Sequence, residues 1–168
     1  MSSLEFTAGT VSAKKSTATL SASMINAGSG ETLLTVEAKD EQGNPLTNLA
    51  RKIQPSVPAG LITIKSAFKE TKLGTYEAKL SATAAKTTQL SIQIDGRKIN
   101  EEPTLTIQPD SKTAQVKGQI KVSSTSAVAG KDVTYSLELE DKYGNPLKAG
   151  EVIFGVLMMV LIYQITKH

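Results

Sequence analysis

The sequence has no cysteine, no tryptophan and a single histidine among its 168 residues. Without cysteine there can be no disulfide and no thiolate metal site. The absence does not place the protein in the cytosol, because many exported domains also lack disulfides. The histidine, His168, is the last residue, where no rigid element orients it as a catalytic base. Aromatic residues are also few, with three Phe and four Tyr. A thin core of Val, Ile, Leu and Ala suits a two-layer β structure better than a deep pocket.

Sequence patterns of the common enzyme classes are missing as well. There is no G-x-S-x-G nucleophile motif and no phosphate-binding G-x-x-x-x-G-K-[ST] run. Glu101 and Glu102 could act as an acid and base pair, but their position before Pro103 better fits a solvated linker. The formal net charge of +3 is spread evenly, without a basic patch for nucleic acid. We therefore predict a non-enzymatic protein with no catalytic residues, no cofactor, no metal site and no nucleic-acid partner.

The two ends of the chain carry no recognisable targeting or anchoring signal. The first fifteen residues show no charged stretch followed by an apolar one, so no export signal is predicted and the location of this product stays open. Residues 152–163 form a twelve-residue apolar run. As a helix it would extend about 18 Å, against about 30 Å of membrane hydrocarbon, so membrane anchoring is not expected. A frameshift or premature stop would also explain this atypical tail, residues 155–168.

An internal repeat organises the sequence. "KDEQGNPL" at residues 39–46 recurs as "EDKYGNPL" at 140–147, an offset of 101, and "SASMINAG" at 21–28 recurs as "SSTSAVAG" at 123–130, an offset of 102. A one-residue gap therefore lies between the two blocks. Leu4 and Phe6 align in the same way with Leu105 and Ile107. A period near 100 residues is the size of a whole small domain.

Alternation of apolar and polar residues predicts short β-strands. Leu34, Val36 and Ala38 alternate with polar residues, as do their repeats Tyr135, Leu137 and Leu139. Further strands are predicted at residues 61–65, 75–80 and 90–94, separated by turns at 58–60, 72–74 and 95–97. The sequence therefore predicts an antiparallel, all-β Greek-key sandwich of the immunoglobulin type.

The repeated Gly-Asn-Pro turn has two interpretations. Asp40, Glu41 and Asn44, with Asp141 and Asn145, could supply oxygen ligands to a hard cation such as calcium. Neither copy has the spaced acidic residues and closing Glu of a calcium loop. We prefer a structural turn in which Gly43 supplies a positive φ, Pro45 fixes the following backbone and Asp40 accepts hydrogen bonds from its own turn.

Tyr76 lies in phase with Ala78 and Leu80 along one predicted strand. An exposed tyrosine could stack on a ligand, but this spacing places Tyr76 in the core. A buried tyrosine needs a partner for its hydroxyl, so we predict a corner-type hydrogen bond to the backbone. The predicted core set is Leu34, Val36, Tyr76, Leu80 and Ile92.

The ordered motifs "FTAGTVSAKKSTATLSAS", "TVEAKDEQGNPL", "GTYEAKLSAT" and "IDGRKIN" resemble the group-1 bacterial immunoglobulin-like (Big) domains of the intimin and invasin family of adhesins. The resemblance covers residues 4–154. It implies a full domain at residues 1–103, a partial second domain at 104–154 and a truncated product. In that family tandem domains form a stalk on the outer membrane, at the cell surface, and a distal domain absent here recognises the host cell.

The resemblance thus implies a structural spacer that supports cell adhesion and virulence, with neighbouring Ig-like domains as partners. Its rigidity would depend on the turn Gly43, Asn44 and Pro45, on the repeat of that turn and on the linker "INEEPTLTI". The alternative is a binding module whose exposed loops, at residues 56–60 or 95–98, recognise a carbohydrate or a host protein. An exposed aromatic cluster would favour this alternative, and the sequence has few aromatic residues to form one.

Overall fold

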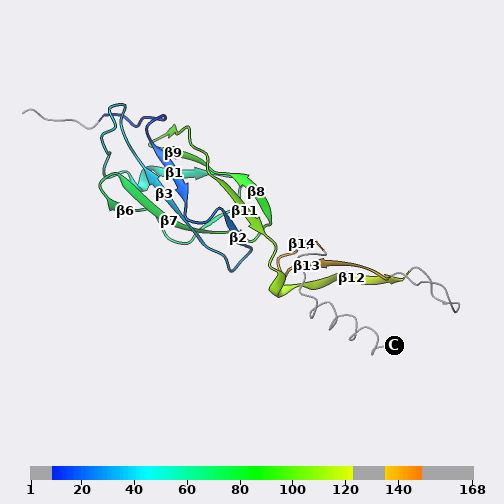
Figure 1. Cartoon of the computed structure of the whole chain (residues 1–168). Helices are drawn as coiled ribbons and strands as arrows, with labels where there is room; N and C mark the ends of the chain where they lie inside the picture. The colour runs from blue at the N-terminus through cyan, green and yellow to red at the C-terminus, as the bar shows by residue number, and fades with distance from the viewer. Residues whose placement is uncertain (1–8, 123–134, 149–168) are drawn as a thin grey trace, which may run out of the picture. The chain divides into compact units, whose positions relative to one another are not determined.

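The computed structural model describes residues 9–122 and 135–148 (Figure 1). The chain divides into two compact units, Met1–Gln108 and Pro109–His168, which we call unit 1 and unit 2. Several features discussed above lie outside the described residues: Leu4 and Phe6, the repeat block at 123–130, the apolar run at 152–163 and His168.

One layer of unit 1 is a five-stranded antiparallel sheet in the order β1-β3-β7-β5, with β6 also paired to β7. Its central pair, β3 and β7, aligns Leu34 with Ala78 and Val36 with Tyr76, so that apolar residues of both strands share one face. The strands are β1 (Thr17–Leu20), β3 (Thr32–Glu37), β5 (Thr63–Ile64), β6 (Lys69–Lys72) and β7 (Thr75–Ser81).

The other layer of unit 1 consists of two three-stranded sheets, β10-β9-β4 and β2-β11-β8. Pro55 lies in β4, an edge strand, where its missing N–H is tolerated. Between β9 and β10 the turn residues Asp95 and Gly96 both have positive φ, which the predicted turn at 95–97 requires. The strands are β2 (Met24–Asn26), β4 (Ile53–Ser56), β8 (Lys86–Gln89), β9 (Ser91–Ile94), β10 (Arg97–Lys98) and β11 (Thr104–Gln108), and a 3₁₀ helix, η1 (Ala50–Lys52), precedes β4.

Side chains from both layers form one hydrophobic cluster. The predicted core residues Leu34, Val36, Tyr76, Leu80 and Ile92 are all fully buried. Buried and less buried positions alternate along β3 and β9 and along most of β7, as the period of two predicted. The described residues contain no α-helix, so the predicted all-β, immunoglobulin-like sandwich is confirmed.

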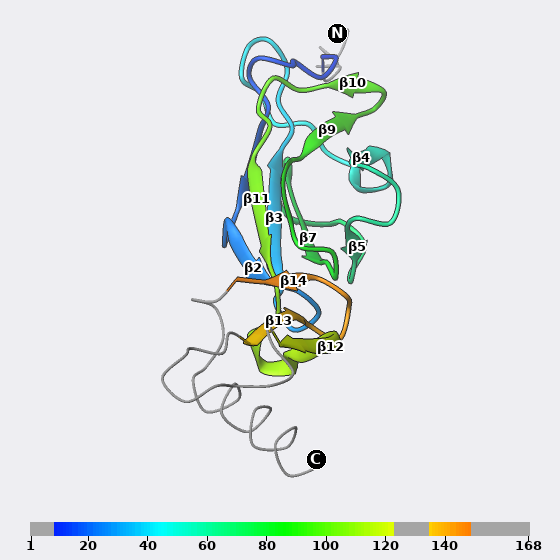
Figure 2. The same cartoon turned by 90° about the vertical axis from the view of Figure 1, so that its right-hand side faces the viewer.

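The chain changes layers between β1 and β2. The Thr32 hydroxyl holds this bend, because it accepts a hydrogen bond from the N–H of Ala22 (3.0 Å) and donates one to its carbonyl (2.7 Å). After the bend, β2 pairs in parallel with β11, the last strand of unit 1 (Figure 2). The predicted antiparallel arrangement is therefore wrong at this pair of strands.

The predicted boundary after residue 103 also needs correction. Residues 104–108 were expected to begin the second domain, but they form β11, which pairs with β8 and β2 of unit 1. The connection between the units therefore follows Gln108, and "INEEPTLTI" is not a linker. Leu105 and Ile107 are buried in the core of unit 1, which explains why this segment belongs there.

The described part of unit 2 contains a 3₁₀ helix, η2 (Ser111–Thr113), and one antiparallel sheet, β12-β13-β14. Its strands are β12 (Gln115–Val122), β13 (Tyr135–Glu140) and β14 (Pro146–Leu147). The register between β12 and β13 shifts between Lys117 and Lys121, around Gly118 with φ +72°. Lys117 and Lys121 are four residues apart in β12, whereas their partners Glu138 and Ser136 are two apart in β13, so β12 holds two extra residues at this irregularity.

Candidate functional site: a buried aspartate turn in each unit

The first Gly-Asn-Pro turn is organised by the carboxylate of Asp40, whose side chain is only 4% exposed. Oδ1 accepts hydrogen bonds from the N–H groups of Gln42 (3.0 Å) and Asn44 (2.8 Å), and Oδ2 accepts one from the Asn44 side-chain amide (3.0 Å). Gly43 has φ +83° within this loop. The predicted roles of Asp40 as a hydrogen-bond acceptor and of Gly43 as the positive-φ residue are confirmed.

The second turn repeats this arrangement around Asp141, which is fully buried. Oδ1 accepts from the N–H groups of Tyr143 (2.9 Å) and Asn145 (2.8 Å), and Oδ2 accepts from the Asn145 amide (2.8 Å). Gly144 has φ +84°, as its counterpart Gly43 has +83°. The sequence repeat is therefore a repeat of one hydrogen-bonded structure.

Each aspartate also binds the segment that leads into its own unit. The backbone of Gly9 hydrogen-bonds to the Asp40 carboxylate, and the N–H of Asp110 donates to Asp141 Oδ2 (3.0 Å). Gly9 and Asp110 are separated by 110 − 9 = 101 residues, the period of the repeat. No spacing in the sequence predicted this contact, although the aspartate recurs with the Gly-Asn-Pro turn. The turn thus fixes the segment that leads into the first strand of its unit.

These hydrogen bonds determine the charge state of both carboxyl groups. Burial alone raises the pKa of Asp40, but the hydrogen bonds from Asn44, Gln42 and Gly9 outweigh burial and hold that pKa below its usual value of 3.8. Burial likewise raises the pKa of Asp141, and the donors on Asp110, Asn145 and Tyr143 lower it by more. Both groups are therefore carboxylates at neutral pH.

We expect the stability of unit 1 to fall in acid through Asp40. A carboxyl whose pKa is lower in the folded chain adds stability above its unfolded pKa, and this stability is lost as the pH falls through the folded pKa. The urea midpoint should be flat from about pH 7 to 5 and should drop below about pH 4. Asp40→Asn should lower the midpoint at pH 7 and reduce the drop in acid. An equal drop in both proteins would contradict this role of Asp40.

Tyr76 connects the core to the residues that follow the first turn. Its hydroxyl donates to the Leu46 carbonyl (2.7 Å) and accepts from the Leu49 N–H (3.1 Å). Burial raises the pKa of this hydroxyl, so it stays protonated and able to donate. The predicted corner hydrogen bond is confirmed, and the alternative of an exposed, ligand-stacking tyrosine is wrong.

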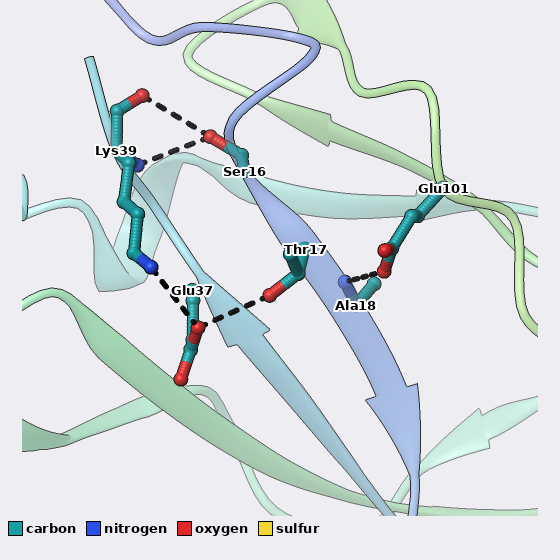
Figure 3. A network of polar contacts seen from close by, with 6 residues as sticks. All are labelled: Ser16, Thr17, Ala18, Glu37, Lys39 and Glu101. Atoms are coloured by element: carbon teal, nitrogen blue, oxygen red, sulfur yellow. Dashed lines mark hydrogen bonds and ion pairs between the residues drawn. The ribbon is translucent and has the colours of Figure 1, made fainter. Parts of the chain in front are cut away.

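A second polar network stabilises the edge strand β1 (Figure 3). Ser16 Oγ exchanges hydrogen bonds with the Lys39 backbone, donating to its carbonyl (3.2 Å) and accepting from its N–H (3.1 Å). Glu101 Oε2 accepts from the N–H of Ala18 (2.9 Å). Glu102 pairs with Lys98 at 2.6 Å. The two adjacent glutamates therefore cap a strand edge and form an ion pair within unit 1, and they do not belong to a linker.

The hydrogen bonds of the two turns occupy the carboxylate oxygens that a metal ion would need. An oxygen that accepts N–H donors faces positive hydrogen atoms, which would repel a cation, so Asp40 and Asp141 are poor metal ligands as folded. Among the described residues no group of three or more His, Asp or Glu side chains could hold a metal ion. Within the same ranges, no helix has the length and apolar character needed to cross a membrane.

The loops suggested for binding are exposed but carry few apolar contacts. Residues 95–98 are all exposed, and residues 56–60 are mostly so. The large apolar side chains that are exposed in the described ranges are Met24, Ile64, Leu73 and Tyr143. Met24 lies in β2, Ile64 in β5, and Leu73 and Tyr143 in two different turns, so none of them lies in either loop. Neither loop therefore has the aromatic centre that typical binding hot spots have.

Comparison with known proteins agrees with an immunoglobulin-like β-sandwich. The family described as "Invasin, domain 3" matches residues 12–110, which is more than half of the chain. The chain therefore belongs to this invasin domain family, and the predicted relation to the invasin and intimin adhesins is confirmed at that level. No curated protein matches the chain.

Solved structures of adhesins share the fold. Invasin, described as a bacterial integrin-binding protein, is 23% identical with a TM-score of 0.64, over 84% of this chain and 29% of invasin. InvD of Yersinia pseudotuberculosis is 24% identical with a TM-score of 0.60, over 83% of this chain and 44% of InvD. The Escherichia coli adhesin FdeC is 20% identical with a TM-score of 0.59, over 83% of this chain and 45% of FdeC. The chain thus spans less than half of each of these relatives.

Proposed function

We propose that the chain is a non-enzymatic spacer module in the stalk of a bacterial surface adhesin. Unit 1 is a complete module of the Big group-1 type, and unit 2 is the beginning of the next module. The parent protein is located on the outer membrane, and a distal domain outside this sequence contacts the host cell. Family membership supports the adhesin class, and the structure of unit 1 supports the spacer role.

The observation that carries the proposal is the parallel pairing of β2 with β11. The pair is closed by hydrogen bonds from the Thr106 N–H to the Ser23 carbonyl (2.8 Å) and from the Ala27 N–H to the Gln108 carbonyl (2.8 Å). Tension between the two ends of unit 1 pulls parallel neighbours in opposite directions along their length. All hydrogen bonds of the pair then resist together, whereas an antiparallel hairpin pulled from its open end breaks them one at a time.

The aspartate turn extends this resistance to the segment before β1. The carboxylate of Asp40 holds the backbone of Gly9, and the Ser12 N–H donates to the Lys39 carbonyl (2.7 Å). The same chemistry in unit 2 joins Asp110 to Asp141. A short connecting segment that is hydrogen-bonded to the unit that follows it leaves little unattached chain to extend under force. A stiff spacer requires this.

An adhesion assay separates the spacer role from direct binding. The full chain is displayed on a non-adherent bacterium, either alone or with a nanobody fused as a distal tip. Alone, it should not increase attachment to host cells or glycan-coated beads, and with the tip it should support attachment to antigen-coated beads. Saturable attachment by the chain without the tip would contradict the proposal and favour the binding module.

A further inference from the structure

Unit 2 repeats the first strands of unit 1, and the repeat shows which edge of β13 has no partner strand in the part of unit 2 that the structure describes. β13 corresponds to β3, with Leu137 in the place of Val36 and Leu139 in the place of Ala38. In unit 1, β3 lies between β1 and β7. In unit 2, β13 pairs with β12 on one side, and on the other side β14 covers only Leu139 and Glu140. Within the described residues of unit 2, no strand takes the place of β7.

β14 does not fill that place, because its counterpart in unit 1 coexists with β7. The Leu46 N–H donates to the Ala38 carbonyl (2.9 Å) while the Ala38 N–H donates to the Gly74 carbonyl (2.9 Å), at the start of β7. Pro146 and Leu147 of β14 are the repeats of Pro45 and Leu46. The edge from Leu137 toward the start of β13 therefore corresponds to the edge that β7 covers in unit 1.

Burial of the side chains gives the same result. Val36 and Ala38 are fully buried (0% exposed) in unit 1. Leu137 and Leu139 are only half-buried at the equivalent positions. In unit 1, Tyr76 of β7 lies opposite Val36, and no described residue of unit 2 takes the equivalent position opposite Leu137. Among residues 109–122 and 135–148, this edge of β13 thus has no partner strand at Leu137 and borders an apolar face, which is the combination that binds an added strand.

We propose that the edge of β13 at Leu137 is a binding site for an extended strand with the side-chain pattern of β7. The inward residues of such a strand are an aromatic, a small residue and a leucine in alternation, as in Tyr76, Ala78 and Leu80. It runs antiparallel to β13 and places its aromatic residue opposite Leu137. The hydroxyl of a tyrosine there reaches the carbonyl of Leu147, as Tyr76 reaches that of Leu46. This site is independent of the spacer role of unit 1.

The test is titration of the full chain with a synthetic peptide of residues 74–81, "GTYEAKLS", labelled for fluorescence anisotropy. We expect saturable binding below about 1 mM. A control peptide of the same composition, with the inward and outward residues exchanged, should bind at least about tenfold more weakly, because its apolar side chains would face solvent. No saturable binding, or equal binding of the two peptides, would overturn the proposal.

Hydrogen exchange locates the bound peptide without any substitution in the chain. In unit 1 the backbone of Val36, the counterpart of Leu137, points toward Tyr76 of β7. The Leu137 N–H therefore points toward the proposed site, whereas that of the neighbouring Glu138 points toward its partner Lys117 in β12. The peptide should slow exchange of the Leu137 amide and leave that of Glu138 nearly unchanged. Leu137→Asp should weaken binding at least about tenfold, and the outward Ser136→Asp should not. Binding without protection at Leu137 would show that the peptide binds elsewhere.

Discussion

Tyr76→Ala should lower the free energy of unfolding of unit 1 by about 3–5 kcal/mol, the usual cost of removing a large buried aromatic side chain. Tyr76 is fully buried between the two layers, so the substitution opens a cavity in the centre of the core. It also leaves the Leu46 carbonyl and the Leu49 N–H without their partner. Equilibrium urea denaturation of the full chain, followed through NMR signals of Leu34 and Ile92 methyl groups, measures the loss.

Tyr76→Phe is the matched variant that separates the hydroxyl from the ring. It keeps the packing and removes only the two hydrogen bonds, which should cost about 1–3 kcal/mol because buried polar groups are left unpaired. Tyr76→Phe should therefore give an intermediate stability. If it were as stable as the unmodified chain, the corner hydrogen bond would contribute nothing, and if it were as unstable as Tyr76→Ala, the cavity would be unimportant.

Gly74→Ala should cost about 2–5 kcal/mol, because two penalties add at this position. Gly74 has φ +74°, where a side chain is strained. A Cβ built there would lie 2.6 Å from Pro45 Cβ and 3.2 Å from the Ala38 carbonyl oxygen. The clash falls on Pro45 of the first Gly-Asn-Pro turn and on the Ala38 carbonyl, which the Leu46 N–H already holds, so neither neighbour can move freely. The same urea experiment measures this effect.

Gly43→Ala provides the control for backbone strain alone. Gly43 has φ +83°, but a Cβ there would meet nothing within 4 Å. We expect a loss of only about 1–2 kcal/mol. The difference between the two variants then measures the close approach of Gly74 to Pro45. Equal losses would mean that β7 does not pack tightly against the turn.

Much of unit 1 could be predicted from sequence because its central strands alternate so regularly. The pattern of Leu34, Val36, Tyr76 and Leu80 predicted both the strands and the buried face, since only one register places all of these residues inside. The turn at Asp40 could be predicted because the repeat at Asp141 showed which residues the structure needs. These features depend on local spacing, which a single sequence displays.

Features that depend on distant contacts could not be predicted in this way. The parallel pairing of β2 with β11 joins segments about 80 residues apart, and β2 is only three residues long, too short for a clear alternation. The cap that Glu101 provides for Ala18 looks like a linker in the sequence, because adjacent acids before a proline usually are solvated. The domain boundary was misplaced for the same reason.

The most direct test of the spacer role is to pull single molecules of the full chain in two geometries. The natural absence of cysteine lets handles be attached at chosen cysteine substitutions. Handles at Thr10 and Lys112 load β2 and β11 in shear, whereas handles at Ser29 and Lys112 pull the same pair apart from one end. We predict a clearly higher unfolding force for the first geometry, with unit 1 unfolding in one step. An equal or lower force would contradict a mechanical function for this pair of strands.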